Sequence, residues 1–348
     1  MPNPPLSPKQ AALAAAGGRR PLDAHGTEAL RLLRAGRNVV LYGPPGTGKT
    51  FSALAVREWW LTQHGPDSVI LATFHPSYSY EDFVEGFRPS IDDPSQFALE
   101  DGVLLEAASR AKGGEVLLVI DEINRGDVAR IFGEIITYIE RDKRNIPFRT
   151  AQRRDREREI PQGLHVIGTM NTADKSISLL DVALRRRFTF IPCPPDPGAF
   201  AAISDWAEAV DGVALADLLS AVNERLLEVG VERDRLVGHA VLAVPRDSAT
   251  PEALLDRLRY DLIPLVEEYL FNDAERVAQV LPGLIRPDGA VNPSYDTAML
   301  RQLAGRGTLA AAEAGGGYQA EGDGTEKSKA QAPSEDEHID DGAPEGHE

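Results

Sequence analysis

The sequence predicts an α/β core followed by a helical domain, and three observations carry this prediction. Short apolar runs at residues 38–42, 68–74, 115–120 and 165–169 alternate with segments of helical periodicity, the pattern of an α/β protein. A glycine-rich loop follows the first apolar run. After residue 197 the periodicity becomes helical, which indicates a second, helical unit.

The composition is that of a globular protein. The 348 residues, 42% of them hydrophobic, suffice for one large domain or two smaller ones. The single cysteine, Cys193, excludes an intrachain disulfide and a thiolate metal cluster, and we expect it to be a small buried residue. The sequence lacks both the apolar core of a signal peptide and an apolar run of membrane-spanning length. We therefore expect a reduced, cytoplasmic protein without a membrane segment.

The negative charge is concentrated at one end of the chain. The formal net charge is −17, and residues 319–348 contribute ten acids against two lysines. This stretch is poor in large apolar residues, so we predict a disordered acidic tail over residues 306–348. Residues 1–22 are predicted to be a flexible lead, 23–197 the α/β core and 198–305 the helical lid. The remaining, mildly acidic part leaves room for a basic pore or groove.

The glycine-rich loop is the most specific signal in the chain. A helix is predicted over residues 23–35 and a strand over 38–42, and the loop connects this strand to a helix over 49–60. Such a loop cradles phosphate with its backbone N–H groups, at the positive end of the following helix. Lysine would reach the β- and γ-phosphates, and the threonine hydroxyl would bind Mg²⁺. The residues of this predicted nucleotide site are Gly43, Pro44, Pro45, Gly46, Thr47, Gly48, Lys49 and Thr50.

A polar and aromatic segment follows the second predicted strand. Residues 74–89 break both helical and strand periodicity, so we predict a loop. Two interpretations stay open: it lines a site, as loops after core strands often do, or it is a packed connector. A helix is predicted next, over residues 100–111.

Asp121 and Glu122 directly follow the apolar strand predicted over residues 115–120. An aspartate and a glutamate at the carboxyl end of a strand suit triphosphate hydrolysis, where Asp121 holds Mg²⁺ through its water shell and Glu122 polarises the attacking water. Alone the pair is a weak signal. Its position some seventy residues after the phosphate loop, in an alternating chain, strengthens it.

A densely charged segment follows a helix predicted over residues 128–141. Residues 141–160 contain many arginines and lysines, either as a basic pore element that faces nucleic acid or a partner, or as a solvated surface insert. Four acids within the segment offset much of the charge and favour the surface insert.

Two further groups of polar residues follow. Asn171 comes after the strand at 165–169, where an amide can hydrogen-bond the γ-phosphate or the attacking water. Arg185, Arg186 and Arg187 precede a strand at 188–191. These arginines either form a solvated basic turn or reach a neighbouring subunit's γ-phosphate at a ring interface. Helices are predicted over residues 199–210, 215–229, 251–258 and 262–271.

These motifs together resemble those of the AAA+ ATPases, and within them the McrB-type motor subunit of 5-methylcytosine restriction systems. The resemblance covers residues 25 to about 275, and its most specific block is Met170-Asn171-Thr172-Ala173-Asp174. It is carried by the segments 43–50, 74–86, 120–125, 168–177 and 183–188.

The resemblance implies both a fold and an activity. The fold is a three-layer phosphate-loop core with sheet order 5-1-4-3-2, followed by a helical lid. The activity is Mg²⁺-dependent hydrolysis of ATP or GTP in a hexameric ring, with Lys49 and Thr50 on phosphate and metal and Asp121 and Glu122 as the hydrolytic pair. The resemblance also implies that Asn171 senses the γ-phosphate and that Arg186 and Arg187 act in trans, on the nucleotide of the neighbouring subunit. A separate McrC-like nuclease subunit is implied, and any contact with DNA is expected to be indirect.

Three departures from the family pattern bear on function. Only some twenty-five residues precede the core, so a domain for reading methylated DNA is not expected. The lid carries the sequence from Val237 to Val241, Val-Gly-His-Ala-Val, where relatives often have Gly-His-Ser-Tyr-Phe, and Lys175 stands where arginine is common. The sequence leaves the choice of base open. Two other functions stay open beside the restriction-system motor. One is a MoxR-like chaperone ATPase that remodels a protein partner, and the other is a nucleotide-gated assembly platform without catalysis.

Overall fold

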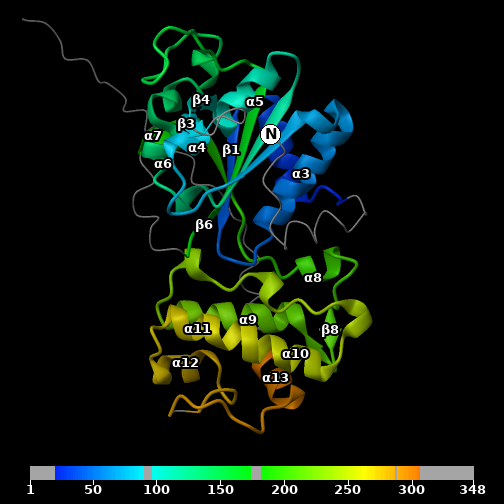
Figure 1. The fold of residues 1–348 in the computed structure, drawn as a ribbon. Coiled ribbons are helices and arrows are strands. Elements are labelled where there is room, and N and C mark those ends of the chain that lie inside the picture. Colours follow the sequence, from blue (N-terminus) through cyan, green and yellow to red (C-terminus); the bar gives the residue numbers. More distant parts are fainter. Residues whose placement is uncertain (1–19, 90–95, 174–181, 287, 306–348) are drawn as a thin grey trace, which may run out of the picture.

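Five parallel strands form the central sheet of the protein (Figure 1). The computed structural model describes residues 20–89, 96–173, 182–286 and 288–305. The strand order is β2-β5-β6-β1-β7, so with these five strands numbered in chain order the predicted order 5-1-4-3-2 is confirmed. The strands are β1 (Asn38–Gly43), β2 (Val69–Thr73), β5 (Val116–Asp121), β6 (Leu164–Asn171) and β7 (Phe188–Pro192).

Helices cover both faces of this sheet, which makes the core three-layered (Figure 1). Along β1, Val39 and Leu41 pack with α2 (Ala24–Arg34) and α3 (Lys49–His64), while Val40 packs with the opposite layer. This alternation follows from the two-residue period of a strand. The opposite layer contains α4 (Tyr80–Phe83), α5 (Val103–Ala111) and α6 (Val128–Phe132). Short turns η1 (Pro66–Ser68) and η2 (Ile123–Arg125) and the helix α7 (Val182–Arg187) complete the core connections.

The segment after β2 is more regular than the sequence predicts. Residues 74–89, expected to be a loop, include α4 and β3 (Glu85–Pro89), and β3 pairs antiparallel with β4 (Phe97–Asp101). Phe74, Tyr78 and Phe83 pack on one another, and both phenylalanines are fully buried. Here these aromatic side chains act as a packed connector.

The helix predicted over 128–141 is wrong in length. It ends at Phe132 because Gly133 has φ +52, and a Cβ at Gly133 would lie 2.8 Å from the ring of Tyr80. The chain continues in the 3-10 turns η3 (Gly133–Thr137) and η4 (Arg141–Lys143). The contact with Tyr80 is distant in sequence, and helical periodicity does not report it.

The basic segment 141–160 is tied to the core by several of its arginines. Arg144 is 4% exposed and bonds the carbonyls of Ile139 and Leu164 and the side chain of Asn38. Arg158 pairs with Asp101 on β4. Burial lowers the pKa of Arg144 to about 10, a value that still leaves it charged at neutral pH. Some of these arginines therefore hold the segment to the core. This role differs from both predicted alternatives, a pore element and a solvated insert.

The helical lid packs around one apolar cluster of its own. A helix predicted over 199–210 is wrong: α8 (Ala199–Ala202) is short, and Ala209 already pairs with Ala214 in a small antiparallel ribbon. The remaining lid elements are β8 (Ala209–Val210), β9 (Val213–Ala214), α9 (Leu215–Glu228), η6 (Arg233–Arg235), η7 (His239–Val241), η8 (Arg246–Ser248), α10 (Pro251–Arg257), η9 (Leu258–Leu262), α11 (Ile263–Tyr269), α12 (Ala274–Val280) and α13 (Thr297–Ala304).

The π-type turn η9 joins α10 and α11 into one nearly continuous helix. Pro264, at the start of α11, has no N–H to donate to the preceding turn, which accounts for the local widening. Among the described residues, no helix is both long enough and apolar enough to cross a bilayer. The predicted lead (apart from its last three residues), the predicted tail and Lys175 lie outside the described residues.

Candidate functional site

The glycine-rich loop folds back on itself between β1 and α3. Gly46 and Gly48 have φ of +77 and +82, values that side chains with a Cβ rarely adopt. The Thr47 hydroxyl donates to the Pro44 carbonyl at 2.9 Å, and Nζ of Lys49 donates to the same carbonyl at 2.6 Å. Because α3 begins at Lys49 and runs for 16 residues, its N–H groups and dipole point into this loop. The loop is therefore shaped to take an anion.

The hydroxyls of two threonines converge on Asp121 at the adjoining edge of the sheet. Asp121 is the last residue of β5, and its Oδ1 accepts from Thr169 Oγ1 at 2.5 Å and from Thr50 Oγ1 at 3.3 Å. Thr50 is exposed and Asp121 is half-buried. A hydroxyl and a carboxylate side by side are hard oxygen ligands of the kind Mg²⁺ prefers, and Mg²⁺ fills its other positions with water and phosphate oxygens. The two side chains fit a Mg²⁺ ion.

Glu122 is held in a strained conformation beside this pair. Its φ of 55 and ψ of 46 are left-handed, a state that costs a non-glycine residue of order 1 to 3 kcal/mol. Its backbone N–H donates to Thr169 Oγ1 at 3.2 Å, and Nδ2 of Asn171 donates to both carboxylate oxygens at 2.7 and 2.9 Å. Asn124 in turn bonds the Asn171 carbonyl at 3.1 Å. Strands β5 and β6 thus fix the direction of the carboxylate.

The three arginines lie at the opposite end of the sheet from the phosphate loop of the same chain. The Arg187 carbonyl accepts from the Asn38 side chain at 3.1 Å, so these residues flank the start of β1. The six residues of β1 separate that point from the loop by about 16 Å. Arg187 is 14% exposed and its Nε lies 2.8 Å from Glu140. Arg186 is exposed. The arginines cannot reach the phosphate loop of their own subunit.

The lid closes directly over the phosphate loop (Figure 1). A Cβ on Gly238 would lie 2.3 Å from backbone atoms of Pro45 and Gly46. The Ala240 N–H donates to the Gly46 carbonyl at 2.9 Å. The backbone at Gly238 is unstrained, with φ of −76. Glycine is therefore needed at this position only because a side chain would collide with the loop.

Sequence reasoning missed a polar cluster on the N-terminal side of the loop. Asp23 caps α2 through the Gly26 N–H at 2.8 Å and accepts from Ser52 Oγ on α3 at 2.7 Å. Burial alone would raise the pKa of Asp23, but hydrogen bonds from His25, Ser52 and the Gly26 N–H outweigh it and lower that pKa. The capping pattern at Asp23 was visible in the sequence, whereas its contact with Ser52 was not.

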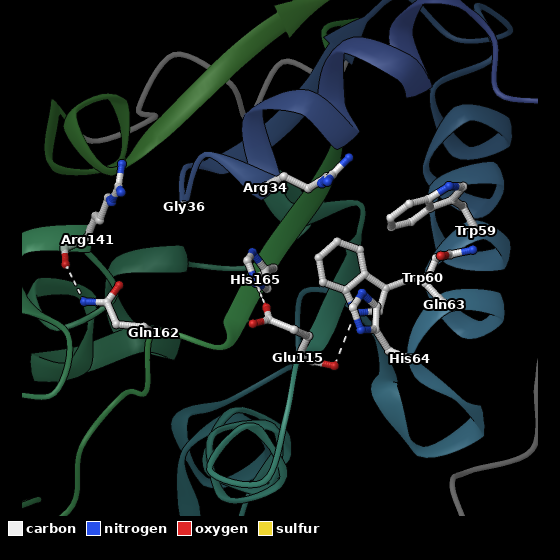
Figure 2. Close-up of a pocket in the computed structure, with 10 residues that line it drawn as sticks. All are labelled: Arg34, Gly36, Trp59, Trp60, Gln63, His64, Glu115, Arg141, Gln162 and His165. Atoms are coloured by element: carbon white, nitrogen blue, oxygen red, sulfur yellow. Dashed lines mark hydrogen bonds and ion pairs between the residues drawn. The ribbon is translucent and has the colours of Figure 1, made fainter.

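Two cavities of similar size lie at different edges of the sheet. One, of about 650 Å³, adjoins Gly43, Pro44 and Thr172, the proline-rich linker after β7 and helix α9 of the lid. The other, of about 660 Å³, is lined by Trp59, Trp60, His64 and His165 near the starts of β5 and β6 (Figure 2). Only the first borders the phosphate loop.

Cys193 is buried next to the loop and is chemically quiet. Its side chain is 1% exposed, and burial raises the pKa of the thiol to about 12. A thiol with that pKa carries almost no thiolate at neutral pH. The structure agrees with the prediction of a small buried residue.

Two parts of the chain match known protein families. Residues 38–188 match the family described as AAA domain (dynein-related subfamily), and this is the stretch from β1 to the start of β7. Residues 214–278 match the family described as McrB, alpha-helical lid domain. The chain belongs to the AAA+ proteins of the McrB type, as the sequence motifs predicted.

Two curated relatives come from restriction systems. The chain is 32% identical over 260 residues to the Type IV methyl-directed restriction enzyme EcoKMcrB subunit of Escherichia coli, covering 70% of this chain and 56% of the relative. It is 27% identical over 197 residues to component YdiS of the Type II restriction enzyme BsuMI of Bacillus subtilis, covering 44% and 56%. The chain thus spans about half the length of these relatives. A structure of NtrX from Brucella abortus matches at 14% identity with a TM-score of 0.35, over 85% of this chain and 71% of that one, which is too low to bear on the fold.

Proposed function

We propose that the protein is a Mg²⁺-dependent nucleoside triphosphatase that uses ATP or GTP. The proposal rests on a hydrogen-bonded set of side chains at the carboxyl ends of β5 and β6. In this set Asp121 accepts from Thr50 and Thr169, and Glu122 accepts from Asn171. This set stands beside a loop shaped for an anion. The alternative, a platform without catalysis, gives no reason for a strained and oriented Glu122.

Each residue has a role that its position supports. A triphosphate would lie on the N–H groups of residues 46–50, and Lys49 would exchange the Pro44 carbonyl for phosphate oxygens. Thr50 and, through water, Asp121 would hold Mg²⁺, which would supply the positive charge that neutralises the phosphate oxygens. Glu122 accepts a hydrogen bond from the attacking water and orients it toward the γ-phosphate. Asn171 keeps that carboxylate in place and donates to the γ-phosphate or the water.

Arg186 is proposed to complete the site of a neighbouring subunit. It is exposed at the far edge of the sheet, out of reach of its own phosphate loop. In a closed head-to-tail ring of six copies, this end of the sheet meets the phosphate loop of the next subunit. An arginine there stabilises the charge of the transition state. Arg187 is proposed to act in trans beside Arg186, and it forms an ion pair with Glu140 of its own chain.

We further propose that the ring drives a restriction or anti-phage defence system in the cytoplasm, together with a separate McrC-like nuclease subunit. The lid match and both restriction-system relatives support this reading over a MoxR-like chaperone ATPase. Any contact of this chain with DNA is then indirect. A nuclease encoded next to the gene is the expected genomic context, whereas a gene for a von Willebrand-type metal-binding protein points to the chaperone.

The test is hydrolysis of ATP and of GTP by the wild type and by Glu122→Gln, with Glu252→Gln on the exposed face of α10 as the matched control. Removing the oriented carboxylate should lower turnover by about 100-fold or more while nucleotide still binds. Glu252→Gln should behave as wild type. A wild type that hydrolyses neither nucleotide, alone or with the product of the neighbouring gene, contradicts the proposal.

A further inference from the structure

We propose that His239 of the lid donates a hydrogen bond from its Nε2 to an oxygen of the bound nucleotide, so that the lid senses occupancy of the phosphate loop. This rests on the proposed function, since it requires a nucleotide on that loop. It assigns a role to His239, which lies in the lid motif Val-Gly-His-Ala-Val that differs from the family's Gly-His-Ser-Tyr-Phe.

The backbone around His239 is clamped onto the loop on both sides. Gly238 approaches Pro45 and Gly46 so closely that any side chain at 238 would collide with them. Ala240 donates to the Gly46 carbonyl. His239 is therefore held against the loop by neighbours that leave its backbone little freedom, and its side chain is only 7% exposed.

The ring has one nitrogen committed and one directed at the loop. Nδ1 accepts from the backbone N–H of Asp196 at 3.2 Å, so the neutral ring carries its proton on Nε2. Nε2 lies 3.6 Å from the point that a Cβ on Gly48 would occupy. Gly48 caps the helix that begins with Lys49. Within the described part of the chain, Nε2 has no protein hydrogen-bond acceptor.

The charges around the ring make it a neutral donor. Burial is the largest influence and lowers the pKa of His239. The carboxylates of Asp196 and Asp23 act in the opposite sense, and His25 and Lys49 reinforce the lowering. At neutral pH the imidazole offers a hydrogen bond without a full positive charge, and Trp206 covers it with ring centroids 5.9 Å apart.

The alternative is that His239 only fills space between lid and loop. A packing role is satisfied by any flat ring, but a donor role requires the Nε2 proton. The link through Asp196 favours the donor role, because it fixes the ring in the tautomer that presents N–H to the loop. Asp196 lies in the linker between β7 and the lid, so the same ring connects linker, lid and loop.

The experiment compares His239→Phe and His239→Gln in the full chain by equilibrium binding of ADP and of a non-hydrolysable triphosphate with Mg²⁺. Loss of one hydrogen bond to a charged oxygen should weaken binding by about 10- to 100-fold in His239→Phe, with partial rescue in His239→Gln. His64→Phe, at the far end of α3, is the control and should bind as wild type. Equal affinity of a folded His239→Phe and the wild type overturns the proposal.

A second readout follows the wild-type protein directly. In wild type labelled with ¹⁵N at its seven histidines, the Nε2 signal of His239, assigned by its loss in His239→Gln, should shift on addition of Mg²⁺ and ADP. An unmoved signal at saturating ADP overturns the inference while leaving the proposed function intact. If wild type binds no nucleotide, or Lys49→Ala binds it equally well, the proposed function itself fails.

Discussion

Substitution of Gly238 by alanine should separate the lid from the phosphate loop. The new Cβ would lie 2.3 Å from backbone atoms of the loop, whereas ordinary contacts begin at 3.4 Å, so lid and loop must move apart by about 1 Å. The bond from the Ala240 N–H to the Gly46 carbonyl, now 2.9 Å, would stretch beyond hydrogen-bonding range. Its loss costs about 0.5 to 1.5 kcal/mol, and overpacking adds about 1 to 3 kcal/mol.

The expected result is a loss of about 2 to 4 kcal/mol in the free energy of unfolding, measured by urea denaturation. Gly114→Ala is the matched control, because a Cβ there meets nothing within 4 Å, and it should stay within about 0.5 kcal/mol of wild type. Because φ at Gly238 is ordinary, the whole effect is steric. A Gly238→Ala protein as stable as Gly114→Ala would refute the close packing of lid on loop.

Three further predictions concern the site and the core. Asn171→Ala should lower turnover by about 100-fold with little change in nucleotide affinity, because the Glu122 carboxylate loses the Asn171 amide that donates to both of its oxygens, as steady-state hydrolysis and equilibrium binding will show. Arg186→Ala should reduce turnover without altering thermal stability, whereas Arg187→Ala should also destabilise the chain by about 1 kcal/mol through loss of its partly buried ion pair. Stability should fall below about pH 6.5 in wild type and fall less steeply in His165→Gln, as urea unfolding at several pH values will show.

The sign of the pH effect follows from burial of His165 beside Trp60 (Figure 2). Burial lowers its pKa, and the bond to Glu115 offsets that only in part. As pH falls below the pKa of the unfolded chain, the unfolded state takes up the proton first, and stability declines until the folded-state pKa is passed. An equal pH dependence in wild type and His165→Gln would contradict this reasoning. Equal stability of the two arginine variants would contradict the structural role given to Arg187.

Much of the sheet and the phosphate loop was predictable because both are written in local sequence. Buried strands read as short apolar runs, and the left-handed positions at Gly46 and Gly48 require glycine. The order of the strands came from the family resemblance, and neither composition nor periodicity supplies it. The pairing of β3 with β4 was missed because it joins residues that are separated in the sequence, and strand propensity depends on such partners.

The candidate site was only partly predictable for the same reason. The residue types at Asp121, Glu122 and Asn171 were evident, but the strained backbone of Glu122 and its grip by Asn171 depend on the register of β5 and β6. The role of Arg144 as a buried donor to four acceptors also escaped prediction. Its neighbours in sequence are charged and exposed, so local composition describes a surface segment.

Equilibrium binding of labelled ATP and GTP to the wild type, with and without Mg²⁺, tests the central claim most directly. Lys49→Ala removes the ammonium group that the loop holds ready, and Lys112→Ala, on an exposed turn, is its control. We predict saturable, Mg²⁺-dependent binding of at least one nucleotide to wild type and Lys112→Ala, and its loss in Lys49→Ala. Undetectable binding to wild type, or undiminished binding to Lys49→Ala, would contradict the account.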